Sequence, residues 1–114
     1  MFDELNNILV RYCDVNMDKI INRKYRIKNF SIEKLRDILS IMGNIERYEE
    51  KSFYIASASG GIAKRNHAFI ATELGTGILK VAVYSEEGII NQHTSEGVLY
   101  EFERKIEKYI DAQE

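Results

Sequence analysis

The sequence contains no proline and only one cysteine, Cys13. Without proline, every residue can donate a backbone hydrogen bond, and slow X-Pro isomerisation cannot limit folding. With one cysteine, no disulfide can form within the chain, whereas small secreted domains usually carry several cysteines. The cysteine count therefore favours an intracellular protein, and we interpret Cys13 as a small buried residue rather than as a nucleophile.

Long apolar runs are also missing. No stretch approaches the roughly 18 consecutive apolar residues that a membrane-spanning helix needs. The N-terminus places Asp3 and Glu4 before the first apolar residues, where a signal peptide would carry basic ones. We therefore expect a cytoplasmic protein without a membrane segment. Its 114 residues, 45% of them hydrophobic, predict a single domain over residues 1–114 with one core.

Three segments repeat apolar side chains every three or four positions, as helices do: residues 2–12, 31–42 and 98–110. Residues 17–21 predict a further, short helical turn. The segment 31–42 has Ser31 as an expected N-cap. Gly43 follows it, where a left-handed residue often ends a helix. We expect residues 22–29 to be a helix end or a loop.

From residue 44 the apolar period changes to two, which is typical of strands. The expected strands are 45–48, 52–58, 66–74, 78–84 and 89–92. The links between them are short and several contain glycine, so they favour hairpins over parallel crossovers. The sequence thus predicts an α+β fold, with an antiparallel meander of four to five strands against two longer helices and one short helix (order α-α-α-β-β-β-β-β-α).

Charge is unevenly distributed although the net charge is only −2. Residues 19–28 contain five cations and no acid, together with Tyr25. Such a segment can contact a nucleic-acid backbone and stack on a base, or it can be a solvated segment that neutralises the acidic C-terminal region. The candidate nucleic-acid-binding residues here are Arg23, Lys24, Tyr25, Arg26 and Lys28.

A second candidate anion site lies in residues 57–67. Paired glycines let a backbone approach a ligand closely, and successive N–H groups can bind an anion. The segment matches no phosphate-loop motif, and a solvated hairpin loop is the alternative. Its candidate residues are Gly60, Gly61, Lys64, Arg65 and His67.

Tyrosines and acidic residues supply the candidates for a protein interface. Tyr54 and Tyr84 are expected to share one sheet face, where tyrosine suits an interface; the alternative is that both faces are covered and these side chains are core. Glu101 and Glu103 on the last predicted helix could pair with a basic partner.

The sequence shows no spacing typical of a metal site or of a nucleophile with its base. We therefore predict no catalytic residue, no metal and no cofactor. The leading hypothesis is a non-catalytic binding protein, of the adaptor or inhibitor type, that acts through a protein partner or by self-association. Nucleic-acid binding through 19–28 with Lys64 and Arg65 is the alternative. A small enzyme acting on a phosphate-bearing substrate at 57–67, with His67 or His93 as acid or base, is the third hypothesis.

Overall fold

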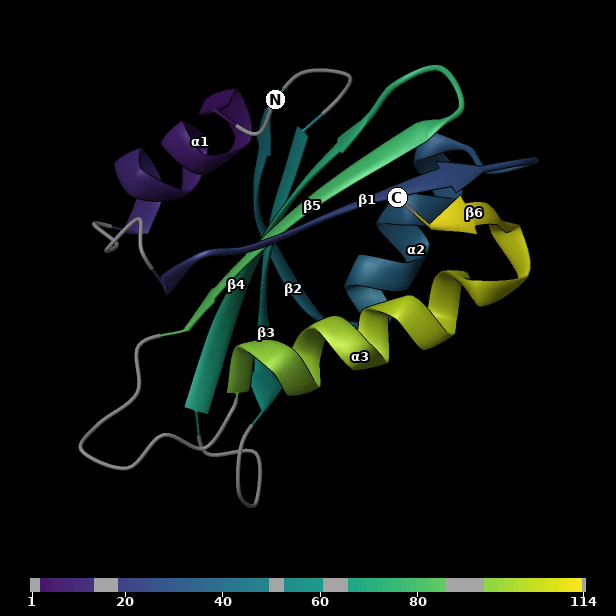
Figure 1. Ribbon diagram of the computed structural model, residues 1–114. Helices are drawn as coiled ribbons and strands as arrows, with labels where there is room; N and C mark the ends of the chain where they lie inside the picture. Colours follow the sequence, from purple (N-terminus) through teal and green to yellow (C-terminus); the bar gives the residue numbers. More distant parts are fainter. Residues whose placement is uncertain (1–2, 14–18, 50–52, 61–65, 86–93, 114) are drawn as a thin grey trace.

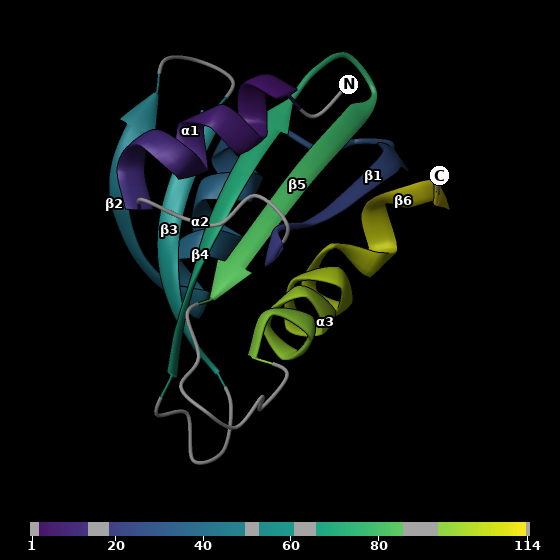
Figure 2. The same cartoon turned by 60° about the vertical axis from the view of Figure 1, so that its left-hand side comes forward.

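Helices cover both faces of a single sheet (Figures 1 and 2). The structure is a computed structural model that describes residues 3–13, 19–49, 53–60, 66–85 and 94–113. Helix α1 (Asp3–Cys13) lies on one face, and α2 (Ile32–Met42) and α3 (Thr94–Ile106) lie on the other. A short 3-10 helix, η4 (Glu107–Tyr109), follows α3. None of the described helices is both long and apolar enough to cross a membrane.

The sheet has six strands in the described part of the chain, and every neighbouring pair is antiparallel. Their order across the sheet is β2-β3-β4-β5-β1-β6. The α+β class is confirmed, as is the hairpin-linked meander from β2 to β5. The strands are β1 (Ile21–Ile27), β2 (Gly43–Glu49), β3 (Phe53–Gly60), β4 (Asn66–Leu74), β5 (Ile78–Ser85) and β6 (Ile110–Gln113).

The central strands are buried on both faces. Alternate residues of a strand point to opposite faces, and on β5 both Val81 and Ala82 are fully buried. Val81 and the other side chains on the same face of the sheet pack with α2 and α3, in the larger core. Ala82 packs with Leu5 and Leu9 of α1, in the smaller core. The sheet therefore has two cores, one on each side.

The second helix begins where its sequence predicts. The Ser31 hydroxyl accepts a hydrogen bond from the Lys34 N–H at 3.3 Å, so the N-cap is confirmed. The helix ends differently from the expectation, because Gly43 is extended rather than left-handed and begins β2. A Cβ on Gly43 would lie 1.6 Å from the carbonyl oxygen of Ser57. Glycine is therefore needed for the close approach of β2 to β3.

Three expectations about element order are wrong. The basic segment 22–29 is mostly strand β1, and Ile21, expected in a short helix, begins that strand. The last helix ends at Ile106, and Ile110 belongs to a sixth strand instead of the helix. Strands β1 and β6 both form by pairing with segments far away in the sequence, and the local spacing of apolar residues does not indicate such pairing. The strand expected at 89–92 lies outside the described residues.

Each edge of the sheet carries a feature that discourages further pairing. At the β2 edge the register with β3 shifts between Ile45 and Arg47, so Glu46 is an extra residue that bulges the strand. At the other edge, β6 has only four residues. Bulges and short strands at sheet edges oppose edge-to-edge association. These features weigh against self-association through either edge strand.

Substitution of Gly43 by alanine should destabilise the protein strongly, by about 3 kcal/mol or more, because the new Cβ would overlap a backbone oxygen. Denaturant unfolding would measure this change. Gly97 of α3 is the matched control, since a Cβ there meets nothing within 4 Å. Gly97→Ala should stabilise by about 0.5–1 kcal/mol through helix propensity. Equal effects at the two glycines would contradict the close contact between β2 and β3.

Candidate functional site

The expected tyrosine surface does not exist. Tyr54 lies opposite Thr72 on β4, and Thr72 lies opposite Val81 on β5, so Tyr54 faces α2 and α3. Tyr84 lies on the other face, under α1. Both side chains are buried. The expectation of a shared, free face is wrong because the register between β3 and β5 is set by β4, which the sequence pattern alone does not align.

Two buried tyrosine hydroxyls connect the sheet to its helices. The Tyr25 hydroxyl of β1 donates a hydrogen bond to Glu103 Oε2 of α3 at 2.9 Å. The Tyr54 hydroxyl of β3 accepts one from Arg36 Nε of α2 at 3.3 Å, and the guanidinium also lies over the Tyr54 ring. Glu103 is therefore held by Tyr25 and is only partly exposed. Glu101, the other predicted acidic contact, is also half-buried.

The pKa of Tyr25 is raised well above its usual value of about 10. Burial is the main cause, because a phenolate would be removed from water. The hydrogen bond to Glu103 and the negative charge of that carboxylate raise the pKa further, and Arg23 opposes them. Tyr25 therefore stays protonated at neutral pH. With its side chain fully buried, it is not placed to stack on a base, which contradicts the role predicted for it in nucleic-acid binding.

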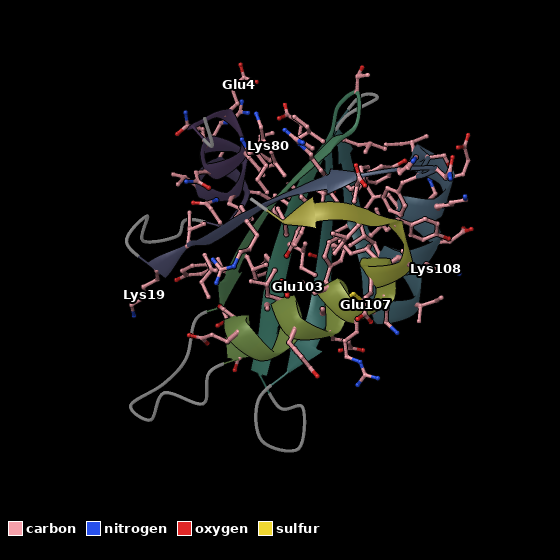
Figure 3. All side chains as sticks on the ribbon, turned by 45° about the vertical axis from the view of Figure 1, so that its right-hand side comes forward. Glu4, Lys19, Lys80, Glu103, Glu107 and Lys108 are labelled. Carbon is pink, nitrogen blue, oxygen red and sulfur yellow. The ribbon has the colours of Figure 1, made fainter. Side chains whose placement is uncertain are left out.

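The basic segment forms a strip along β1. Lys24 and Arg26 point to the α1 side of the sheet, and Arg23 points to the α3 side with Tyr25. Lys24 lies directly opposite Lys80 of β5, which brings a sixth cation to the segment. Figure 3 shows Lys19 near the start of β1 and Lys80 toward α1. We call this set the β1 cationic strip: Lys19, Arg23, Lys24, Arg26, Lys28 and Lys80.

The strip lies beside α1 rather than beneath it. α1 packs on Ile55, Ala71 and Ala82, in the part of the sheet next to the strip. Its contact with β1 is a pair of side-chain hydrogen bonds of 2.8 and 3.2 Å between Asn6 and Asn22. Beyond Asn22, the β1 side chains on this side are Lys24, half-buried, and Arg26, exposed.

Glu73 forms an ion pair with a lysine of the strip. Glu73 of β4 lies opposite Lys80, and its carboxylate is 3.3 Å from the Lys80 amine. Both side chains are about a quarter exposed, at 24% and 26%, so the ion pair contributes little stability. Lys24, Lys80 and Glu73 thus form a row across three strands. Like charges directly opposite each other are unfavourable in a sheet, and Glu73 places an opposite charge beside Lys80.

The predicted 57–67 site is only partly described. Register pairs Ser59 with His67 and Gly60 with Asn66, so the ends of this segment belong to the β3–β4 hairpin. Gly61, Lys64 and Arg65 lie outside the described residues, as does His93. Anion binding there, and an acid-base role for either histidine, stay predictions.

Within the described ranges, no three side chains among His, Cys, Asp and Glu gather as a metal site would require. The described buried polar groups are instead structural: the hydroxyls of Ser85 and Ser95 lie 2.7 Å apart and connect β5 to α3. The Thr72 hydroxyl is buried without a hydrogen-bond partner in the described structure.

Sequence reasoning missed Lys80 and the Asn6–Asn22 contact. The signal for Lys80 was present, because it is a lone charge between Leu79 and Val81 in an apolar strand. Its position beside Lys24 depends on the register of β1 and β5, which has no local signal.

Loss of the Tyr25 hydroxyl should change how stability responds to alkaline pH. The pKa of the Tyr25 hydroxyl is higher in the folded state than in the unfolded chain, where it is about 10. The buried, protonated hydroxyl therefore contributes its full stability below about pH 10, and this contribution is lost as the pH rises further. Wild type should therefore lose up to about 1.4 kcal/mol per pH unit above pH 10 relative to Tyr25→Phe. Denaturant unfolding from pH 8 to 11 measures the difference. Parallel curves would show that the hydroxyl is not protected.

Thr72→Val should leave stability unchanged or raise it, by up to about 1–3 kcal/mol, since valine has the same shape without an unpaired hydroxyl. Thermal and denaturant unfolding measure the change. Ser85→Ala is the control, and should destabilise because it leaves the Ser95 hydroxyl without its partner. A clear loss of stability in Thr72→Val would show that this hydroxyl is bonded.

Comparisons with protein-family models, with curated proteins and with solved structures gave no match. What this protein does must therefore be inferred from its own residues and their geometry.

Proposed function

We propose that this protein is a non-catalytic binding protein that recognises an acidic protein partner through the β1 cationic strip. The observation that carries the proposal is the direct apposition of Lys24 and Lys80, flanked by Arg26, on a part of the sheet beside α1. A fold gains no stability from placing two lysines opposite each other. Carboxylates of an acidic partner would bring opposite charges to this group of cations.

Electrostatics supports an acidic partner. The strip brings six cations together along β1 and its neighbour β5, and Glu73 pairs with Lys80, although the whole chain carries a net charge of −2. Local charge of one sign attracts an oppositely charged partner over about a Debye length of 8–10 Å and speeds encounter. The other side of the molecule has mixed charge: Figure 3 shows Glu103, Glu107 and Lys108 there, on α3 and η4.

Protein is favoured over nucleic acid as the partner. Sequence-tolerant binding of single strands combines a cationic groove with aromatic side chains that stack on bases. In the strip's strand the aromatic residue is Tyr25, which is fully buried and hydrogen-bonded to Glu103. Phe30, just beyond it, packs against Tyr109 with ring centroids 4.9 Å apart. Neither ring is placed for stacking beside the cations.

The decisive experiment compares two charge-neutralising double variants that change the net charge equally. Lys24→Gln with Arg26→Gln removes cations from the strip, and Arg104→Gln with Lys108→Gln removes exposed cations from the α3 side. Fluorescence anisotropy at low salt would measure the affinity for a labelled glutamate-rich peptide. The strip variant should bind about tenfold more weakly than wild type, and the control should bind nearly as wild type does.

A labelled single-stranded RNA of equal charge is the competing probe. Binding of the RNA without binding of the peptide would replace the proposal with nucleic-acid recognition. Failure of the glutamate-rich peptide to bind at low salt, or equal weakening by both double variants, would overturn it.

A further inference from the structure

We propose that two copies of this chain associate through the outer face of α3, with the two helices antiparallel. We define this face as four exposed residues: Glu96, Gly97, Tyr100 and Arg104. Their spacing of one, three and four residues places them on one side of the helix, opposite the side that packs on the sheet. Figures 1 and 2 show α3 across the sheet from α1. The contact therefore lies away from the α1 side of the β1 cationic strip, and the inference does not depend on the proposed function.

Tyr100 lies at the centre of this face. Its side chain is 62% exposed, which leaves a large apolar ring in water. The Arg104 guanidinium lies over this ring, 5.9 Å from its centroid, so the two side chains already order each other. Tyrosine and arginine are among the residues that most often dominate the binding energy of protein interfaces. An exposed pair of this kind therefore fits the centre of a protein contact.

Gly97 is a glycine in the interior of a helix, one turn before Tyr100. Glycine lowers the stability of a helix relative to alanine. The described structure gives no steric reason for it, because a Cβ at this position would meet no atom within 4 Å. On an exposed helix face, a bare backbone lets a second helix approach closely and leaves room for its tyrosine ring. Contact with a second helix thus explains this glycine.

The charges on this face are complementary to themselves. Glu96 lies four residues before Tyr100, and Arg104 lies four residues after it. In an antiparallel pair with a two-fold axis at Tyr100, the Glu96 of each copy lies opposite the Arg104 of the other copy. Two identical ion pairs then flank the two tyrosines. A parallel pair would instead place like charges side by side, which is unfavourable.

This symmetry favours a second copy of the chain over a different partner. A partner with charge of one sign would meet both an acid and a base on this face, and one of them would repel it. Helix α3 has 13 residues and so spans only about 20 Å. Two such helices bury less surface than a standard protein interface. We therefore expect a weak dimer, with a dissociation constant of about 10–100 µM.

Sedimentation equilibrium of the full protein, from about 5 to about 500 µM, tests this dimer. At low salt, wild type should change from the 13.2 kDa monomer to a dimer over this range. Glu96→Arg and Arg104→Glu each place like charges opposite each other, so each variant should dimerise at least about tenfold more weakly. Arg11→Glu makes the same charge change at an exposed position of α1, on the other face of the sheet. This control should dimerise as wild type does.

A mixture of the two α3 charge variants separates loss of the contact from loss of the fold. In a heterodimer of the Glu96→Arg chain with the Arg104→Glu chain, one helix carries two bases and the other carries two acids. Both ion pairs are then restored. The equimolar mixture should therefore dimerise nearly as wild type does, although neither variant does so alone.

Gly97→Gln gives a second readout. It should stabilise the monomer, because glutamine is the better helix former, and it should prevent the close approach of the two helices. Denaturant unfolding at low protein concentration and sedimentation measure these two effects. A wild type that stays monomeric at about 500 µM would overturn the proposal. A dimer that Arg104→Glu leaves unchanged, or a mixture of the two charge variants that stays monomeric, would also overturn it.

Discussion

The fold depends on keeping water from both faces of β4 and β5. Neighbouring residues on these strands, such as Ile70 and Ala71 or Val81 and Ala82, are all fully buried. A sheet of this kind needs helices on both sides, and the chain provides α1 for one and α2 with α3 for the other. Helix α1 packs mainly on β4 and β5, whereas α2 packs on β2 and β3 and α3 packs on β3 to β5. On the α1 side of β1, beyond Asn22, charged side chains can therefore remain in contact with water, and Lys24 and Arg26 of the cationic strip lie there.

The packing of Tyr25 in the core determines to which face of the sheet the neighbouring cations point. Its ring is completely buried and its hydroxyl is bound to Glu103 of α3, so the orientation of β1 at this residue is well defined. Because side chains alternate along a strand, Lys24 and Arg26 on either side must point to the opposite face. The core contact thus decides where the cations lie. A shift of register by one residue would turn the cations toward α3.

The strip also illustrates how a weakly acidic chain can present a cationic surface. The net charge of −2 sums the whole sequence, whereas a partner responds to charges within about a Debye length. Lys24 and Lys80 are 56 residues apart in the chain yet directly opposite in the sheet. Glu73 pairs with Lys80 and so places an opposite charge beside them.

The sequence by itself determined the α+β class, the capped helix after Ser31 and the hairpins from β2 to β5, because caps, periodicity and short links act between neighbouring residues. It did not determine that the basic segment is a strand, that Tyr54 and Tyr84 face opposite sides, or that Gly43 is required by Ser57. Only the tertiary structure decided these points. Strand pairing joins residues far apart in the chain, and a shift of one residue in register moves every side chain to the other face.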